Sequence, residues 1–523
     1  MKHSKSIIKQ ASILAVAGIL VRIIGLLYRS PLTAIIGPEG MGYYSSAYNI
    51  YALILLISSY SIPTAISKLI SEKLTLHQYR YAKKILHGSL IYITVVGGSF
   101  SIITFIIAPF ILPEASVPAL RVLCPTIFLS GLLGVFRGYF QAHRITLYTS
   151  ISQIIEQIFN AVVSVIAAYL FIQPFLNADH TLMSSMGASG SALGTGIGVL
   201  AALIYMLILF FTKKQKYSSD QDDYEESYKK ILVTILNIVT PIILATCVYN
   251  IISTIDMYLL YFALGSDKEI STLWGVYAGQ YIVLQNVPIA LASALSTASI
   301  PAISGLWVSH QYKETRRQIH SNIRIAMLIL IPSAVGMAVL SYPIISLIFP
   351  QKSTIMISSK LLAFGSPAIV FYGLSTLTNG ILQSLGLVRT PLINATKALV
   401  VHCLLVIILL FFTPLGIYAL LIGNCTYALH VCYLNQKALH IKLHLKPSIR
   451  ELYLIPFITS IVMGIVVYLS YQGLQYLFHI RFISLGVSIV IGVVIYFIGI
   501  LYFYQDHMQS LSDLPFVSRF IKK

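Results

Sequence analysis

Two arginines, Arg22 and Arg29, lie inside the first long apolar stretch of this 523-residue chain. Seven residues make almost two turns of an α-helix, so both side chains project from one face, about 10 Å apart along the axis. A charge at membrane depth costs at least a few kcal/mol unless it meets a partner or a water-filled cavity. Guanidinium groups also grip phosphate oxygens in pairs. The spacing therefore predicts a cavity for an anion, although Arg29, near the end of the stretch, could instead reach the membrane interface.

Further polar residues occur where the sequence is otherwise apolar. Asp256 lies deep in such a run, close to Asn250. Glu156 belongs to a polar stripe at helical spacing that consists of Gln153, Glu156, Gln157 and Asn160. We expect each of the two carboxylates either to pair with a buried base or to bind a cation. For Asp256 we favour a role in a cavity and in coupling; for Glu156 both interpretations stay open.

Three more residues complete the predicted cavity. Lys397 lies two turns into a later apolar stretch, and Gln280 and Gln285 precede Pro288, which suggests a wet face beside a helix break. We predict that the anion is held by Arg22, Arg29, Lys397 and Gln280. The cavity's other polar residues are predicted to be Asp256, Glu156, Asn250 and Gln285. The sequence contains no nucleophile elbow, phosphate-binding glycine loop or CxxC pair, so we expect a transporter without a resident metal or cofactor, not an enzyme.

The composition indicates an all-α polytopic membrane protein. Hydrophobic residues make up 57% of the chain and charged residues only 10%, against about 25% in soluble proteins. Apolar windows of about 20 residues predict about fourteen transmembrane helices. Most of the 35 lysines and arginines fall in alternate loops, which predicts that both termini are cytoplasmic. The net charge of +18 would then face anionic lipid, so we expect no nucleic-acid partner.

An internal repeat predicts how these helices are grouped. The segments 61–69 and 299–306 resemble each other, and each is followed by a basic loop that begins His-Gln-Tyr, at His77 and at His310. The copies are six helices apart, and an even number preserves orientation in the membrane. We therefore expect two parallel-related six-helix lobes plus a C-terminal helix pair. The expected domains are an N-terminal lobe at 1–212, a cytoplasmic linker at 213–230, a second lobe at 231–438, and the helix pair with its tail at 439–523.

Several motifs together resemble a known family. The run from Arg22 to Arg29, the Gly37-Pro-Glu39-Gly40 turn and the stretch from Ala290 to Pro301 are similar to the polysaccharide-export branch of the MOP flippase superfamily. That branch contains the MurJ-type lipid II flippases and the stage V sporulation protein B-like proteins. The resemblance covers essentially the whole chain. It implies fourteen helices, a groove for a lipid tail made by the last helix pair, and transport of an undecaprenyl-diphosphate-linked sugar with the first-helix arginines at the diphosphate.

The departures from the family leave the transported glycan open. The best-known MurJ branch has further arginines early in the second helix and in the eighth, where this chain reads Tyr48-Asn-Ile-Tyr51 and Ala278-Gly-Gln280. Lipid II for peptidoglycan synthesis and another lipid-linked polysaccharide are both alternatives. A cation-coupled multidrug antiporter and a non-transporting scaffold for cell-wall synthesis enzymes are two more. We expect a monomer in the bacterial plasma membrane, in contact with membrane lipids and coupled to a monovalent cation or to the membrane potential.

Overall fold

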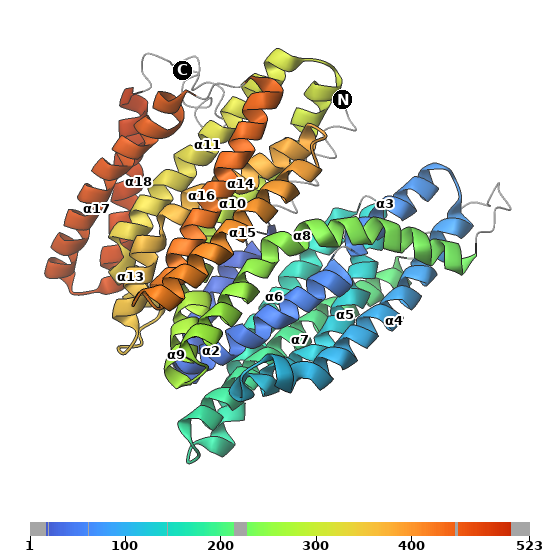
Figure 1. Ribbon diagram of the computed structural model, residues 1–523, viewed down its shortest axis with the longest axis horizontal. Coiled ribbons are helices and arrows are strands. Elements are labelled where there is room, and N and C mark those ends of the chain that lie inside the picture. The colour runs from blue at the N-terminus through green and yellow to red at the C-terminus, as the bar shows by residue number, and fades with distance from the viewer. Residues whose placement is uncertain are drawn as a thin grey trace. The chain divides into compact units, whose positions relative to one another are not determined.

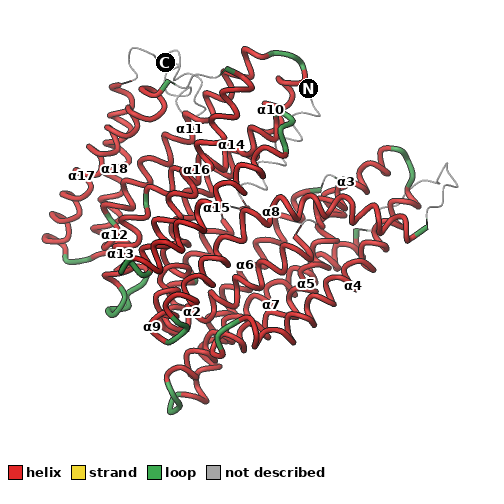
Figure 2. The backbone as a smooth tube through the Cα atoms, viewed as in Figure 1, coloured by secondary structure: helices red, strands yellow, loops and turns green. Residues whose placement is uncertain are grey.

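The computed structural model describes residues 17–503 except 19, 61, 144, 214–226 and 445–447, and every regular element in these residues is a helix (Figure 2). This follows from the composition, because a membrane-embedded backbone must satisfy its hydrogen bonds within its own segment. Contacts within the chain define two compact units, Met1–Gly279 and Gln280–Lys523.

The first unit begins with a helix over residues 20–27 that leads into α2. Its further elements are α2 (Arg29–Leu55), the π-helix η1 (Leu56–Tyr60), α3 (Ile62–Thr75), α4 (Tyr79–Ile111), α5 (Val117–Ala142), α6 (Thr146–Ile172), α7 (His180–Thr212), α8 (Tyr228–Leu264), α9 (Lys268–Trp274) and the start of the π-helix η4 (Gly275–Tyr281). Helix α8 packs against α2 and α4, which places it in this unit. The expected linker at 213–230 lies mostly outside the described residues, and the domain limits stay a prediction.

The chain turns back on itself within α2. Gly37 has φ +72° and ψ 171°, outside the helical region, and is followed by Pro38. Glycine adopts such a φ without a steric penalty, and proline readily starts the next helical segment. Arg29 lies within electrostatic range of Tyr44 and Tyr48, although a straight helix would separate Arg29 from Tyr44 by about 22 Å. The break at Gly37 therefore brings the arginine-bearing segment alongside the segment that follows.

Helix α6 is held tightly against α7 by a row of glycines. Gly190, Gly194 and Gly198 of α7 are spaced four residues apart, and a Cβ atom on any of them would collide with α6. The atoms that it would meet belong to Ala167, Ser164 and Glu156 respectively. Small residues at this spacing let helix backbones approach closely in membranes. The packing fixes the rotation of α6, and with it the direction of its polar stripe.

The second unit contains the remaining helices. They are α10 (Ile282–Val308), α11 (Tyr312–Val339), α12 (Ser341–Ile348), α13 (Ile355–Gly365), α14 (Pro367–Ser384), α15 (Arg389–Phe412), α16 (Ile417–Leu443), the π-helix η5 (Arg450–Leu454), α17 (Ile455–Phe478) and α18 (Arg481–Phe503). Helices α13 and α14 meet at a bend of 49°. The last two helices, red in Figure 1, pair with each other, and α17 also packs against α11.

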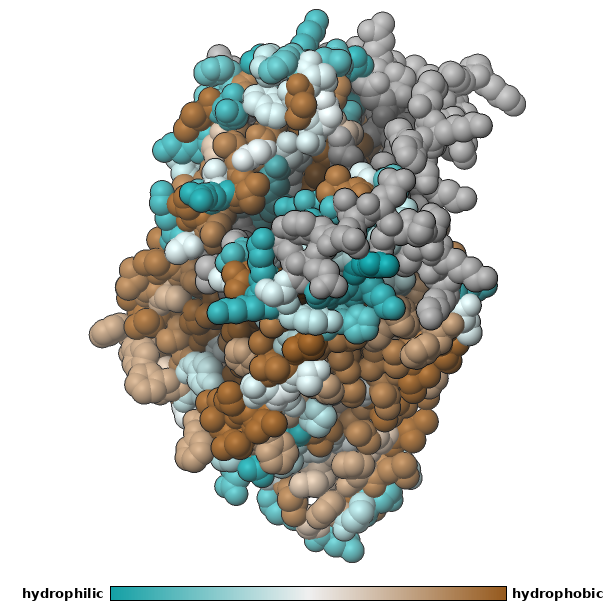
Figure 3. Space-filling model, turned by 90° about the vertical axis from the view of Figure 1, so that its right-hand side faces the viewer, coloured by the Kyte–Doolittle hydropathy of each residue, from teal (hydrophilic) through white to brown (hydrophobic). Residues whose placement is uncertain are grey.

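The outward faces of the helices are apolar. Large hydrophobic side chains are exposed on α4, α6, α15, α17 and α18, and hydrophobic residues cover much of the face seen in Figure 3. Such surfaces are stable only against lipid. Among the described residues, 11 helices are long and apolar enough to cross a membrane, or up to 12 with the bent pair counted as one span. The chain is therefore an all-α membrane protein, while the count of about fourteen stays a prediction.

The two His-Gln-Tyr segments adopt the same turn. His77 and His310 have φ values of 58° and 57°, which few non-glycine residues adopt. In each segment the histidine Nδ1 lies 2.9 Å from the hydroxyl of the tyrosine two residues later. Each turn also joins two long helices, α3 to α4 in the first unit and α10 to α11 in the second. This shared local geometry supports the predicted repeat.

Candidate functional site

The two first-helix arginines have different surroundings. Arg22 is exposed. Arg29 is partly buried, and its Nη1 donates a hydrogen bond to the carbonyl oxygen of Gly279, at 3.3 Å. Gly279 lies in η4, and π-helical turns interrupt the regular hydrogen-bonding pattern of a helix and are frequent at functional sites. Arg29 thus contacts a backbone carbonyl in this conformation, and it is less exposed than Arg22.

The polar stripe of α6 lies beside the first helix. A Cβ atom on Gly25 would lie 3.2 Å from Nε2 of Gln157. Glu156 accepts a hydrogen bond from Nη2 of Arg137 at 2.7 Å, and Arg137 Nε donates to Ser152 Oγ at 2.8 Å. Glu156 therefore adopts the first of its two predicted alternatives, pairing with a base. Arg137 comes from the end of α5, a position that the sequence assigned to a cytoplasmic segment.

Three tyrosines, Tyr44, Tyr48 and Tyr51, form a row of aromatic side chains along α2. The rings of Tyr44 and Tyr48 are 5.8 Å apart, and those of Tyr48 and Tyr51 are 5.6 Å apart. The Tyr44 hydroxyl lies 3.4 Å from Oγ1 of Thr195 on α7. Because tyrosine combines an apolar ring with a polar tip, the row gives the region around Arg29 a mixed character. In the sequence, Tyr48 and Tyr51 stood out only as departures from the family's arginine pattern, and Tyr44 was not singled out.

The predicted coupling residues on α8 differ in burial. Asp256 is only 1% exposed, whereas Asn250 on the same helix is exposed. A buried carboxylate needs a compensating partner, since an isolated charge in apolar surroundings is costly. Its burial fits either predicted alternative, a base or a bound cation, and the coupling role of both residues stays a prediction.

The remaining predicted residues belong to the second unit. Gln280 is fully buried, and its Oε1 accepts a hydrogen bond from Ser358 at 2.7 Å. Gln285 is also buried, and its Nε2 has no hydrogen-bond partner within the described part of the chain. Lys397 is exposed on α15, in a stripe with the exposed apolar residues Ile393 and Val400. Gln280 and Gln285 are thus buried in this conformation, and the binding roles of all three residues stay predictions.

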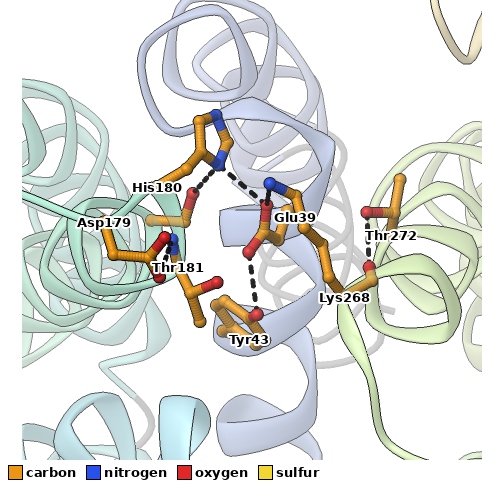
Figure 4. Close-up of polar contacts among 8 residues, drawn as sticks. Glu39, Tyr43, Asp179, His180, Thr181, Lys268 and Thr272 are labelled. Carbon is orange, nitrogen blue, oxygen red and sulfur yellow. Dashed lines mark hydrogen bonds and ion pairs between the residues drawn. The ribbon is translucent and has the colours of Figure 1, made fainter.

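A buried carboxylate that sequence analysis missed lies just after the turn of α2. Glu39 is 3% exposed, and both of its oxygens are engaged (Figure 4). Oε1 accepts a hydrogen bond from the Tyr43 hydroxyl at 2.9 Å; Oε2 lies 2.9 Å from Nδ1 of His180 and 3.3 Å from Nζ of Lys268. We call these four residues the Glu39 cluster. It joins α2 to the starts of α7 and α9 within the first unit.

The Glu39 cluster is positioned by the caps of two helices. Asp179 caps α7 by accepting a hydrogen bond from the backbone N–H of Thr181, and Asp267 caps α9 in the same way through Ile270. His180 and Lys268 directly follow these caps. The charge of Lys268 lies in a first helical turn, where the helix dipole disfavours cations. The Glu39 carboxylate offsets that cost. The contact between α2, α7 and α9 therefore depends on the opposite charges of Glu39 and Lys268.

Next to this cluster, α2 and α9 cross with almost no space between their backbones. A Cβ atom on Gly42 would collide with the carbonyl oxygen of Ser271. A Cβ atom on Gly275 would collide in turn with the carbonyl oxygen of Pro38 and the nitrogen of Gly42. Only glycine fits at either position in this conformation. The Glu39 cluster and this crossing lie at the end of the first unit that is predicted to face outward.

The second unit contains an apolar groove of about 460 Å³. It runs between α10, α11, α17 and α18, and its walls include Pro288, Leu328, Gly336, Met463 and Val493. Ser333 and Tyr496 contribute the polar groups to an otherwise hydrophobic lining. The volume is within the range of ligand-binding pockets. An extended hydrocarbon fits the groove chemically, and the last helix pair forms one of its walls.

Comparison with known proteins identifies the family of this chain. The family model for polysaccharide biosynthesis proteins matches residues 7–307, and the MatE model matches residues 241–408. Lipid II flippase MurJ of Bacillus subtilis (strain 168) is 23% identical over 425 residues, 77% of each chain. Stage V sporulation protein B of the same organism is 23% identical over 539 aligned positions, which cover 99% of each chain.

Solved structures show the same fold. A structure of lipid II flippase MurJ in an inward closed conformation aligns with a TM-score of 0.70 at 19% identity, over 95% of this chain and 99% of that one. An inward-facing multidrug resistance MATE family transporter of the MOP superfamily aligns with a TM-score of 0.61 at 16% identity, over 82% and 95%. The chain therefore belongs to the polysaccharide biosynthesis protein family, in the MurJ- and stage V sporulation protein B-like part of the MOP superfamily, and it is a membrane transporter rather than an enzyme.

Proposed function

We propose that this transporter moves an undecaprenyl-diphosphate-linked sugar precursor, with lipid II as the first candidate, from the inner to the outer leaflet of the bacterial plasma membrane. The observation that carries the proposal is the pair of arginines on the first helix, one of them exposed at Arg22. A diphosphate presents the oxygen pairs that guanidinium binds best. A polyprenyl tail needs an apolar path, for which the groove between α10, α11, α17 and α18 is available.

Transport proceeds by alternating access. The crossing of Gly42 with Gly275 and the Glu39 cluster hold the outer end shut while the substrate enters from the cytoplasmic side. Opening to the outside separates α2 from α9, which breaks these contacts together with the bond from Arg29 to Gly279. Arg22 receives the diphosphate first because it is accessible in the present state. A monovalent cation at Asp256, or the membrane potential, drives the cycle.

Two other functions have specific support. The similarity to stage V sporulation protein B over the whole chain favours another lipid-linked polysaccharide as the cargo. The match of the MatE model to residues 241–408 favours a small-molecule antiporter. An antiporter of small molecules would leave the apolar groove without a role, and it would not need guanidinium groups at membrane depth. We therefore rank it below both lipid-linked cargoes.

Replacement of a bacterium's essential lipid II flippase by this chain tests the cargo. Survival supports lipid II. Failure by a chain that reaches the membrane, combined with transport of another undecaprenyl-diphosphate glycan in vesicles, would assign the alternative cargo. Failure on every such lipid, combined with drug efflux, would overturn the flippase proposal.

The role of Arg22 is tested in vesicles that contain a fluorescent undecaprenyl-diphosphate sugar. Arg22→Ala should slow flipping by about tenfold or more, because one charge-assisted hydrogen bond contributes about 1.5–3 kcal/mol. Arg22→Lys should recover part of the rate, since lysine keeps the charge but not the planar fork. Arg121→Ala is the matched control, because Arg121 is exposed in the same unit and lies over the Phe105 ring. Normal flipping by well-folded Arg22→Ala would show that Arg22 does not bind the substrate.

A further inference from the structure

A second pocket in the second unit has a different chemistry from the apolar groove. It has a volume of about 270 Å³ and lies between the start of α11, the end of α16 and η5. Its lining includes the basic side chains of His320, Lys437 and His440 together with Leu439, Leu452 and Tyr453. The start of α11 and the end of α16 both adjoin segments predicted to be cytoplasmic. The pocket therefore lies at the predicted cytoplasmic surface of the membrane.

This pocket combines basic side chains at its edge with an apolar floor. Lys437 and His440 are exposed, and His320 is half-buried. Leu452 is 1% exposed and forms part of the floor with the buried Leu439. One wall is fixed by the hydrogen bond that Gln436 Nε2 donates to the Tyr453 hydroxyl, at 2.8 Å. An amphipathic molecule with an anionic end would satisfy both surfaces.

The charges around the pocket favour an anion. Lys437 supplies the positive charge at the edge of the pocket, and buried Arg324 lies within electrostatic range of His320. Glu451 is the acidic group within range of the same histidine, and it does not line the pocket. Lys442 lies 5.5 Å from the centre of the Trp307 ring near this end of α16. Basic pockets between helices on the cytoplasmic side are typical binding places for anionic lipid headgroups.

The surroundings of the pocket point to a molecule of the bilayer. The elements that form it also carry exposed apolar residues, Leu429 and Ile441 on α16, Leu454 at the end of η5 and Phe457 at the start of α17. Tyr433 is 60% exposed, as expected of a tyrosine at the level of the headgroups. A ligand that enters between these faces would come from the membrane rather than from water.

The pocket is also separate from the apolar groove. On α11 the groove uses Leu328 and residues beyond it, whereas this pocket uses His320 and Ile323, and the two linings share no residue. Because a helix rises about 1.5 Å per residue, the groove lies further along α11 than the pocket. The proposed path of the polyprenyl tail therefore does not pass through the pocket.

We propose that the pocket between α11, α16 and η5 binds an anionic membrane phospholipid, with the phosphate at Lys437 and His440 and the start of an acyl chain over Leu439 and Leu452. The site requires no flippase activity, so it stands independently of the proposed cargo. Because it joins α11 and α16 to the start of α17, the lipid would stabilise the attachment of the last helix pair.

The test uses the full chain, purified in a neutral detergent and stripped of lipid. Phosphatidylglycerol or phosphatidylcholine is titrated in, and bound lipids are counted by native mass spectrometry. We expect the wild type to bind one phosphatidylglycerol at least about tenfold more tightly than phosphatidylcholine, and Lys437→Gln with His440→Gln to lose that preference. Lys437→Arg should keep the preference, and so should the control Lys313→Gln, an exposed lysine in the first turn of α11.

Two results would overturn the proposal. An unchanged preference for phosphatidylglycerol in the double variant would place the lipid elsewhere. Binding of inorganic phosphate alone, at concentrations that displace phosphatidylglycerol, would show that the pocket takes a soluble anion. Single Lys437→Gln keeps the test decisive if the double variant misfolds, because Lys437 is exposed and its truncation leaves the packed core intact.

Discussion

The crossing of α2 and α9 yields the sharpest prediction. Replacing Gly42 with alanine adds one methyl group where the carbonyl oxygen of Ser271 already lies within contact distance. The obstacle is backbone, which cannot rotate away as a flexible side chain can. The closed conformation must therefore separate the two helices or lose stability. A conformation in which α2 and α9 are apart is not affected by the methyl group.

The size of the effect follows from packing energetics. Overpacking of one or a few methyl groups typically costs about 1–3 kcal/mol. The gain in helix propensity from glycine to alanine, about 1 kcal/mol, applies to both conformations and cancels. The ratio of open to closed molecules should therefore rise about 5- to 150-fold. Gly275→Ala should act in the same direction, because its methyl group would meet Pro38 and Gly42 from the other side.

The assay reads opening through a reporter cysteine at Ser46 in a background without the five native cysteines. Ser46 is fully buried on α2, and its hydroxyl lies 2.9 Å from that of Tyr261 on α8. An impermeant thiol reagent added outside intact cells should label the reporter faster in Gly42→Ala. Gly98→Ala is the control, since Gly98 is within α4 and has no atom within 4 Å of the added methyl group.

One outcome would refute this reasoning. If Gly42→Ala reached the membrane, melted like the wild type and labelled at the wild-type rate, the crossing would not be a gate. Loss of folding alone would be a different result, visible as a lower melting temperature in neutral detergent. In that case Gly275→Ala, which adds the methyl group from the other side of the crossing, would decide between a gate and a static contact.

Four further predictions follow from the same structure. Glu39→Gln should raise labelling of the same reporter by roughly 5- to 30-fold, because the lost charged contact with the partly exposed His180 and Lys268 contributes about 1–2 kcal/mol. An unchanged rate would show that the Glu39 cluster has no part in gating. Gly336→Leu should fill the apolar groove and slow flipping of long-chain substrates more than of short-chain analogues, since Gly336 has open space up to Met463 Cε at 4.0 Å, and equal slowing would argue against a tail path. Asp256→Asn should abolish the dependence of transport on membrane potential or cation concentration, and wild-type behaviour would remove it from coupling. Cysteines replacing Ser266 and Ser309 should be labelled from outside and protected, respectively, in intact cells, and the reverse pattern would invert the topology.

The sequence was sufficient for the fold class, whereas the roles of the predicted site residues stay predictions. Hydropathy predicted a helical membrane protein, because apolar length is read locally. Helical periodicity predicted a polar stripe on α6, and the structure pairs Glu156 of that stripe with Arg137. The sequence did not predict which residue pairs with Glu156. Arg137 lies on another helix, and the sequence contains no local sign of their pairing.

Glu39 shows most clearly what sequence reasoning missed. It lies in a glycine-rich turn, so a search for charges within apolar windows passes over it. Its partners His180 and Lys268 are 141 and 229 positions away, and only the packing of α2, α7 and α9 brings them together. A sign was nevertheless present. Both partners directly follow an aspartate that caps a helix, which indicates two helix starts at one membrane surface.

The bond from Arg29 to Gly279 indicates why the two first-helix arginines are not equivalent. In this conformation the Arg29 guanidinium donates to a backbone carbonyl, so substrate must compete for it, and Arg29 is less exposed than Arg22. A diphosphate is a stronger partner for Arg29 than the carbonyl oxygen of Gly279, because the guanidinium and the diphosphate are both charged. Substrate bound at Arg22 would thus draw Arg29 away from η4 and weaken the closed end. Arg22→Ala should therefore mainly weaken substrate binding, while Arg29→Ala should raise labelling of the Ser46 reporter even without substrate. If Arg29→Ala left labelling unchanged and both variants weakened binding equally, the arginines would form one anion site and Arg29 would have no part in opening the transporter.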